Sequence, residues 1–184
     1  MAQNVNYHNS KLGRVFGRKK LHLFDSFAGL PDPQSNLVDS ENLMVINGVW
    51  SESSLTGLNY TQLSNRLQRV IAKKDFKIYP GFFLETLPDF NAKVALIHID
   101  SDLYSSAQEI LDSLFSRNLI SDGCLIMFDD YDLNQANPRS GERLAWSEAV
   151  LKYQIQYSDR SSYGLFGHKY LIHGYVSPSS MESK

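Results

Sequence analysis

Two short apolar runs that each end in aspartates constrain the fold of this chain more than any other feature. The runs read IHIDSD, from Ile97 to Asp102, and IMFDDY, from Ile126 to Tyr131. Such runs are typical of strands buried in a parallel sheet, and a carboxylate directly after such a strand lies at the carboxyl edge of the sheet. Open α/β folds bind their ligands at this edge. The sequence therefore predicts an α/β fold with carboxylates gathered at one sheet edge.

Apolar runs of strand length alternate with longer helical patterns along the chain, which is the arrangement of βα units around a mostly parallel sheet. Strands are expected over Leu21 to Phe24, Phe76 to Tyr79, Val94 to Ile99 and Cys124 to Phe128. The third is apolar almost throughout, as a strand buried on both faces should be. His98 lies in the middle of it, and we expect a core histidine there rather than a metal ligand.

Three segments place apolar residues at helical spacing. Helices are expected over Thr61 to Lys73, from Ser105 or Ser106 as the cap to about Arg117, and over Gly141 to Lys152. In the last helix, the apolar residues at helical spacing are Leu144, Ala145, Val150 and Leu151. Tyr153 to Tyr157 and His168 to Tyr175 flank a Ser/Gly loop and predict an antiparallel hairpin that closes one sheet edge.

Length and composition limit the class of protein. At 184 residues the chain is expected to form one domain, and a net charge of −2 gives no electrostatic reason to expect nucleic-acid binding. The longest apolar stretch is far shorter than the roughly 20 residues of a membrane span, and the N-terminus lacks the apolar core of a signal peptide. We therefore expect no membrane partner and a cytoplasmic location. The one cysteine, Cys124, is expected to be a small buried residue rather than a nucleophile.

Four aspartates follow the two acidic strands: Asp100, Asp102, Asp129 and Asp130. Several carboxylates at one sheet edge repel one another unless a cation joins them, and oxygen-only ligands favour Mg²⁺, Mn²⁺ or Ca²⁺ over zinc. The competing interpretation is that Asp100 or Asp130 only caps the next helix and that Asp102 is a solvated turn residue. The carboxylates thus predict a metal-dependent active site, with local capping as the alternative.

Five segments resemble, in order and spacing, the macrocin O-methyltransferase family of S-adenosylmethionine-dependent enzymes, which methylate sugar hydroxyls of antibiotics and related glycosides. They read FDSFAGLPDP, GFFLETLPDF, LIHIDSDLYSSAQEIL, DGCLIMFDDYDL and SGERLAWSEAV, within about Leu21 to Val150. The resemblance implies a class I methyltransferase (Rossmann-like) fold with a mostly parallel sheet and a C-terminal antiparallel hairpin. It also implies S-adenosylmethionine and Mg²⁺ as cofactors and a glycoside or other polyol as the small-molecule substrate.

The resemblance implies chemical roles at the acidic edge. Asp100, Asp129 and Asp130 match the family's metal ligands, and Asp102 matches its proposed general base. A divalent ion that coordinates a sugar hydroxyl makes its proton easier to remove, and a nearby carboxylate can then take that proton. Tyr104, which follows DSDL, is expected either to face the substrate or to cover the sheet.

The resemblance also implies contacts to the cofactor. Asp25, with Ser26 beside it, matches a position near the ribose, where a carboxylate can accept hydrogen bonds from two hydroxyls. Gly81 and Phe82 match the segment that lines the adenine, and Asp100 is counted with these contacts. The alternatives are a turn-initiating role for Asp25 and a packed core position for Phe82.

The chain departs from the family pattern before Leu21. A class I methyltransferase begins with a strand and a glycine-rich turn, and the residues MAQNVNYHNSKLGRVFGRKK show neither. We expect an N-terminal extension over residues 1–20, a methyltransferase-like domain that lacks its first strand over 21–176, and a disordered tail over 177–184. Loss of that strand would leave the strands of Leu21 and Val94 each with an unpaired edge. Three arrangements would resolve this: a longer reading frame that includes the missing strand, direct pairing of the two strands, or a separate chain that supplies the strand. We favour the first.

Two other functions stay open at this stage. A strand followed by DxD is also typical of a nucleotide-sugar glycosyltransferase, although that interpretation leaves DDY and DSF-GLP unexplained. A truncated methyltransferase-like subunit without catalytic activity is the other alternative. The acceptor and the oligomeric state, including a homo-oligomer, are not fixed by the sequence, and the segment Asn47 to Tyr60 with Trp50 is a candidate for acceptor choice.

Overall fold

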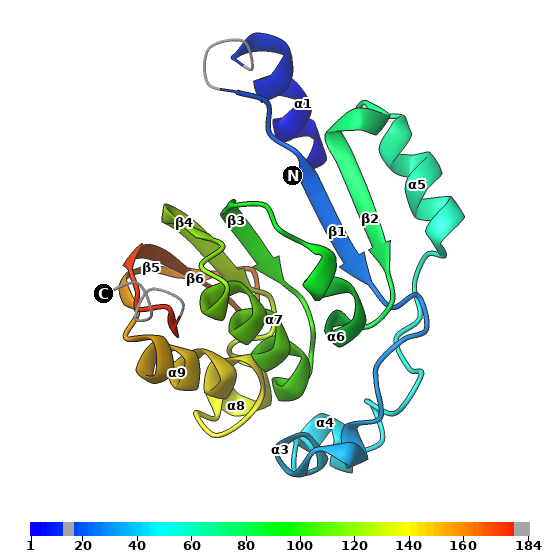
Figure 1. Ribbon diagram of the computed structural model, residues 1–184. Helices are drawn as coiled ribbons and strands as arrows, with labels where there is room; N and C mark the ends of the chain where they lie inside the picture. Colours follow the sequence, from blue (N-terminus) through cyan, green and yellow to red (C-terminus); the bar gives the residue numbers. More distant parts are fainter. Residues whose placement is uncertain (13–16, 179–184) are drawn as a thin grey trace. The chain divides into compact units, whose positions relative to one another are not determined.

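The computed structural model describes residues 1–12 and 17–178, and its internal contacts divide the chain into two compact units. The first unit comprises Met1–Pro31 and Ser53–Thr86, and the second comprises Asp32–Glu52 and Leu87–Lys184. Each unit contains its own sheet (Figure 1). No helix in the described ranges combines the length and the apolar character that a membrane crossing requires.

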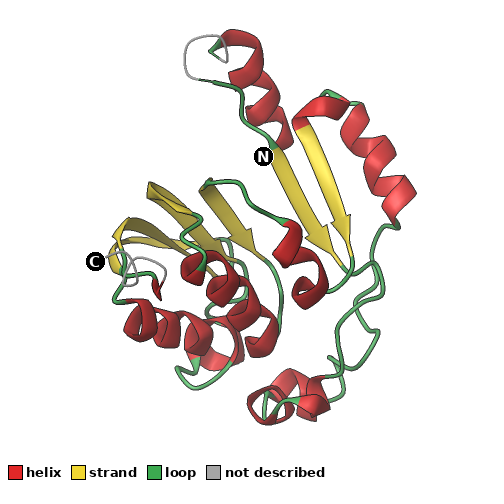
Figure 2. Cartoon of the chain, in the orientation of Figure 1, coloured by secondary structure: helices red, strands yellow, loops and turns green. Residues whose placement is uncertain are grey.

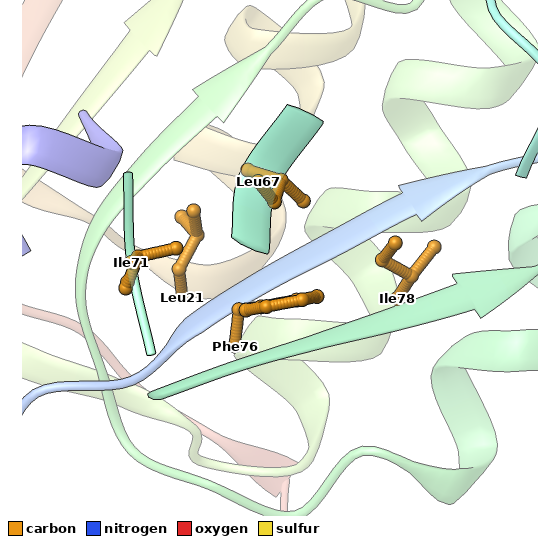
Figure 3. Packing of buried hydrophobic residues seen from close by; sticks show 5 residues of the cluster. All are labelled: Leu21, Leu67, Ile71, Phe76 and Ile78. Carbon is orange, nitrogen blue, oxygen red and sulfur yellow. The ribbon is translucent and has the colours of Figure 1, made fainter. Parts of the chain in front are cut away.

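The first unit is built on two parallel strands, β1 (Leu21–Asp25) and β2 (Phe76–Pro80). Its helices are α1 (Ala2–Lys11), α5 (Tyr60–Gln68) and α6 (Phe83–Thr86), with a 3₁₀ turn at Lys73–Asp75. Its core contains five buried side chains, shown in Figure 3: Leu21, Leu67, Ile71, Phe76 and Ile78. Ala2 and Val5 of α1 pack against this cluster, so part of the predicted N-terminal extension is helical and belongs to the first unit.

The helix α5 is shorter than predicted. It begins at a capping box in which Asn59 and Gln62 exchange side-chain and backbone hydrogen bonds. It ends at Gln68 because the backbone then tightens, with the N–H groups of Val70 and Ile71 both donating to the carbonyl of Leu67. This tightening turns Ile71 into the core and leaves Val70 at 37% exposure.

The second unit contains a four-stranded sheet in the order β3-β4-β6-β5. The strands β3 (Val94–Ile99) and β4 (Ile120–Phe128) are parallel, whereas β6 (Gly167–Gly174) is antiparallel to both β4 and β5 (Gln156–Tyr163). The two long helices, α7 (Tyr104–Ser116) and α9 (Gly141–Tyr153), pack against each other and lie on one side of this sheet (Figure 2). The predicted hairpin is confirmed, although its first strand begins later because Tyr153 ends α9.

Short helical elements complete the second unit. They are α3 (Leu37–Ser40), α4 (Leu43–Ile46), α8 (Leu133–Ala136) and 3₁₀ turns at Pro33–Ser35 and Leu87–Asp89. Ser177 is buried, and its hydroxyl donates to the carbonyl of Ser116 at 2.8 Å, so the first residue of the predicted disordered tail is fixed to α7. Residues 179–184 of that tail lie outside the described residues.

The prediction that β3 is buried on both faces was wrong. Ile97 and Ile99 are buried on the side of α7 and α9, but Leu96 is 42% exposed and His98 is also exposed. The run is apolar, yet burial alternates along it because the described helices of this unit cover the face that carries the two isoleucines. The start of β4 was also predicted too late, since Asp122–Gly123 lies within the strand at a shift of register against β3.

The apolar residues that predicted α9 do not all lie on its buried face. Leu151 is 80% exposed. The buried residues of the helix are Gly141, Glu142, Ala145, Trp146, Ala149 and Tyr153. The two large aromatic side chains fix the orientation, because Trp146 stacks on Tyr170 at 4.8 Å and Tyr153 stacks on Phe115 at 5.5 Å between ring centroids.

The start of α7 is capped from a distance rather than by its own serines. Neither Ser105 nor Ser106 caps the helix, whose N-cap residue is Leu103. The carboxylate of Asp39, a fully buried residue of α3, accepts the N–H groups of Tyr104 at 2.7 Å and Ser105 at 3.2 Å. A buried carboxylate therefore satisfies two N–H groups that have no partner within the helix.

Four strands, β1, β2, β3 and β5, each have one edge without a partner strand in the described residues. β1 pairs with β2, and β3 pairs with β4. Each of the two sheets thus has open edges within the described residues.

Candidate active site

The parallel pairing of β3 and β4 brings the two acidic segments together. Ile99 is in register with Phe128, and the N–H of Asp129 donates to the carbonyl of Ile99 at 2.9 Å. The chain therefore leaves both strands at the same level of the sheet. The predicted convergence of the carboxylates follows from this register.

Burial and neighbouring carboxylates affect the protonation of two aspartates at this edge, Asp102 and Asp130. Burial raises the pKa of Asp102 to about 7, with further contributions from Asp130 and Asp100. The side chains of Asp102 and Asp130 share a hydrogen bond, and burial together with Asp100 and Asp129 also raises the pKa of Asp130. Asp102 has a φ of +61°, in the left-handed region that aspartate adopts more readily than most residues, and it is partly buried.

His98 is part of this edge, which corrects its assignment as a core histidine. Its Nε2 lies 3.1 Å from the hydroxyl of Tyr163 and 3.4 Å from Oδ1 of Asp129. The hydroxyl of Tyr163 donates to the carbonyl of Phe128 at 2.9 Å and lies 3.4 Å from the same Asp129 oxygen. The two side chains support Asp129 from β3 and β5.

Tyr163 reaches Asp129 because β6 carries a glycine beneath it. A Cβ at Gly167 would lie 2.5 to 2.8 Å from three atoms of the Tyr163 ring, closer than real side chains approach. Gly167 is paired with Tyr163 in the β5–β6 ladder. Only glycine leaves room for the ring to lie across β6.

Glu142 is a functional candidate that the sequence interpretation missed. It is 1% exposed, and its carboxylate accepts the N–H of Ser101 at 3.4 Å and the N–H of Asp130 at 2.9 Å. Burial raises the pKa of Glu142 well above its ordinary value. The available signal was an acidic residue in the first turn of a helix, three positions before the small buried residue Ala145.

The chemistry of the donors suits an oxygen-seeking cation, but their arrangement does not form a finished metal site. No group of three or more His, Cys, Asp or Glu side chains placed to hold a metal occurs in residues 1–12 and 17–178. Two observations fit a bound cation at this edge. Burial and neighbouring carboxylates raise the pKa values of Asp102 and Asp130, and the buried hydroxyl of Ser101, between Asp100 and Asp102, has no hydrogen-bond partner in the described chain.

The predicted cofactor contacts of the first unit lie together at the carboxyl ends of β1 and β2. The N–H of Gly81 donates to the carbonyl of Asp25 at 3.0 Å. Asp25 is exposed, and its Oδ1 accepts the N–H of Phe27 at 2.6 Å, so it does initiate a turn. The hydroxyl of Ser26 closes the same turn on the carbonyl of Gly29. Phe82 is 37% exposed, which excludes a packed core position for its ring.

Local structure accounts for the glycine at position 81. Its φ is +133°, and a Cβ there would lie 3.0 Å from Oε2 of Glu85 and 3.1 Å from Cγ2 of Thr86.

Two aromatic candidates for substrate contact also have structural roles. Tyr104 is buried, with its hydroxyl donating to Oε2 of Glu148 on α9 at 2.7 Å, and Trp50 is 4% exposed.

Comparison with known proteins identifies relatives of this chain. The family model described as Macrocin-O-methyltransferase (TylF) matches residues 11–148. A curated protein of Streptomyces olivaceus, 8-demethyl-8-(2,3-dimethoxy-alpha-L-rhamnosyl)-tetracenomycin-C 4'-O-methyltransferase, is 30% identical over 121 residues, which are 63% of this chain and 43% of that protein. The chain thus spans less than half the length of this relative.

A solved structure shares the fold. The O-methyltransferase NovP matches with a TM-score of 0.69 and 21% identity, over 88% of this chain and 62% of that chain. The likeness confirms the Rossmann-like α/β fold predicted from the sequence, with its parallel strands and C-terminal antiparallel hairpin. Because the family model covers well over half of the residues, the predicted resemblance is confirmed, and the chain belongs to the macrocin-O-methyltransferase (TylF) family.

Proposed function

We propose that this chain acts as an S-adenosylmethionine-dependent O-methyltransferase on a sugar or other polyol hydroxyl of a glycoside, with Mg²⁺ as its metal. The observation that carries the proposal is the cluster of four carboxylates at the carboxyl edge of β3 and β4, in a chain of the macrocin-O-methyltransferase family. The name of the Streptomyces olivaceus relative supports this substrate class, because it describes a methyl transfer to a 4' oxygen on a substrate with a rhamnosyl group. A cytoplasmic location stays a prediction.

Asp102 is the proposed general base. S-adenosylmethionine would supply an electrophilic methyl group, and Mg²⁺ would make the acceptor hydroxyl easier to deprotonate. A sugar hydroxyl is a weak nucleophile, so a positioned carboxylate that takes its proton favours the transfer. Burial, the largest cause of the raised pKa of Asp102, also makes this carboxylate a better proton acceptor than an ordinary aspartate.

Asp100, Asp129 and Asp130 are the proposed metal ligands. Their carboxylate oxygens are the donors that Mg²⁺ prefers, and a cation would offset both the burial of the Asp130 carboxylate and its repulsion by Asp100 and Asp129, which together raise its pKa. His98 and Tyr163 would hold Asp129 in place from neighbouring strands. The support comes from donor chemistry and from family membership.

The proposed cofactor contacts are Asp25, Ser26, Gly81 and Phe82, together with Asp100. Asp25 presents an exposed carboxylate after β1, where it can accept hydrogen bonds from ribose hydroxyls. The half-exposed ring of Phe82 can stack on an adenine. Both residues follow the ends of paired parallel strands, which is where this class of fold binds its ligands.

Donor binding tests the proposal against its alternatives. S-adenosylmethionine and UDP-glucose are titrated separately into the folded chain by calorimetry, each with excess Mg²⁺ and then with excess Mn²⁺. The proposal predicts heat from S-adenosylmethionine with a dissociation constant in the micromolar range and no heat from UDP-glucose. Binding of UDP-glucose alone would favour a glycosyltransferase, and binding of neither would favour a subunit without catalytic activity.

A further inference from the structure

Glu142 is a buried carboxylate that touches both acidic segments of the candidate site. Its Oε1 accepts the N–H of Ser101 at 3.4 Å, and its Oε2 accepts the N–H of Asp130 at 2.9 Å. Ser101 belongs to the segment after β3, and Asp130 belongs to the segment after β4. One carboxylate therefore joins the backbones of the two segments that carry the candidate ligands and base.

The helix α9 holds this carboxylate in a fixed place. Glu142 lies in the first turn, where the N-terminus of a helix favours negative charge. Trp146, one turn further along, is 2% exposed and stacks on Tyr170 of β6, so the start of the helix cannot shift freely over the sheet. A Cβ at Gly141 would lie 3.9 Å from the backbone oxygen of Asp102, so the first residue of α9 lies beside the acidic segment that follows β3.

We propose that Glu142 is a positioning residue that sets the separation of the DSD and DDY segments and thereby holds Asp102 beside Asp130. The inference rests on the proposed function for its catalytic meaning. Ser101 lies between Asp100 and Asp102 in the chain, and Asp130 is itself a candidate ligand, so the two N–H groups that bind Glu142 belong to the backbone that carries these side chains. A buried carboxylate that accepts one N–H from each segment fixes this separation without itself contacting a substrate.

The substitution Glu142→Gln separates this role from simple space filling. A glutamine side chain has nearly the same size but only one acceptor oxygen, so it can accept one of the two N–H groups and presents its own N–H₂ to the other. Glu148→Gln is the matched control on the same helix, because the Glu148 carboxylate accepts from Tyr104 and lies outside both acidic segments. The probe is Mn²⁺ alone, titrated into the full chain and followed by electron paramagnetic resonance.

The expected result is Mn²⁺ binding that is roughly tenfold to a hundredfold weaker in Glu142→Gln than in the wild type, as is usual for groups that orient metal ligands. Glu148→Gln is expected to bind within about twofold of the wild type, since its change does not reach the ligands. Equal Mn²⁺ affinity in Glu142→Gln and the wild type would overturn the inference. Absence of binding by the wild type would instead contradict the metal dependence of the proposed function.

Amide hydrogen exchange, measured by nuclear magnetic resonance without metal, judges the inference on its own. The N–H groups of Ser101 and Asp130 are both expected to be protected in the wild type, and at least one of them should exchange about tenfold faster in Glu142→Gln, because glutamine can accept only one of the two. Unchanged exchange of both amides in the variant would contradict the bridge. If Glu142→Gln does not fold, the wild type alone decides. Rapid exchange of both the Ser101 and Asp130 amides would contradict the inference, and protection of both amides would support it.

Discussion

Replacing Asp102 by asparagine should stabilise the metal-free protein while removing its proposed base. The carboxylate is partly buried beside Asp130 and Asp100, so its ionised form is unfavourable in the folded state. An amide avoids this charge, and its N–H₂ can still donate a hydrogen bond to Asp130. Asparagine also tolerates the left-handed backbone at this position, where φ is +61°.

The size of the effect follows from the pKa. A rise from the ordinary value of 3.8 to about 7, at about 1.4 kcal/mol for each tenfold change in acid strength, sets an upper bound of about 4 kcal/mol. Water screens a carboxylate that is not fully buried, so we take about half of this, roughly 2 kcal/mol.

The sign with pH follows from linkage. The folded state binds the proton more tightly than the unfolded state, so the cost is absent well below pH 4, grows as the pH rises, and is complete above about pH 7. Asp102→Asn should therefore exceed the wild type in free energy of unfolding by roughly 1 kcal/mol at pH 5 and roughly 2 kcal/mol at pH 8.

Urea unfolding of the two proteins in EDTA, at pH 5 and at pH 8, measures this difference. Asp122→Asn is the control, because Asp122 is an exposed residue within β4 and its substitution does not remove a buried charge. The control should change the unfolding free energy by less than about 0.5 kcal/mol at either pH. A variant Asp102→Asn that is no more stable than the wild type at pH 8, or whose advantage is the same at both pH values, would refute the reasoning.

Two further substitutions test the supports of the site by their effect on urea unfolding. Gly167→Ala places a methyl group within 2.5 Å of the Tyr163 ring and should lower the free energy of unfolding by about 1 to 3 kcal/mol. Gly174→Ala is the control on the same strand, and it should lower this free energy by less because the site has more room. Equal losses would show that the ring is not held against β6. Asp39→Asn leaves one of two buried N–H groups of α7 without an acceptor and should lower the free energy of unfolding by about 1 to 3 kcal/mol. The control Asp32→Asn, at an exposed 3₁₀ turn, should lower it by about a few tenths of a kcal/mol. An Asp39→Asn variant as stable as the wild type would contradict the capping role of Asp39.

The acidic edge could be predicted because its signal is local. The run from Val94 to Ile99 is a strand with the predicted bounds, and β4 ends at Phe128 as predicted. Parallel pairing of such runs places the residues after them side by side, so the meeting of Asp102 with Asp130 followed from the chain order and the strand type.

The residues that support the edge could not be predicted in the same way, because tertiary contacts decide their roles. His98 has the sequence neighbours of a core residue, but its exposure depends on which face of β3 the helices cover. The burial of Glu142 depends on the orientation of α9, which the ring contacts of Trp146 and Tyr153 fix. Asp39 caps α7 from 65 residues away, which no local capping pattern reveals.

The central claim is tested most directly by an assay of methyl transfer. S-adenosylmethionine, Mg²⁺ and a panel of glycosides are supplied to the wild type, to Asp129→Asn and to the control Asp122→Asn. The account predicts that the wild type and Asp122→Asn transfer the methyl group to at least one sugar hydroxyl. Asp129→Asn should lose transfer by at least about a hundredfold while its circular dichroism is unchanged, because a proposed ligand of the metal is neutralised. Full activity of Asp129→Asn would remove this carboxylate from the active site, and a folded wild type that methylates no acceptor would contradict the account.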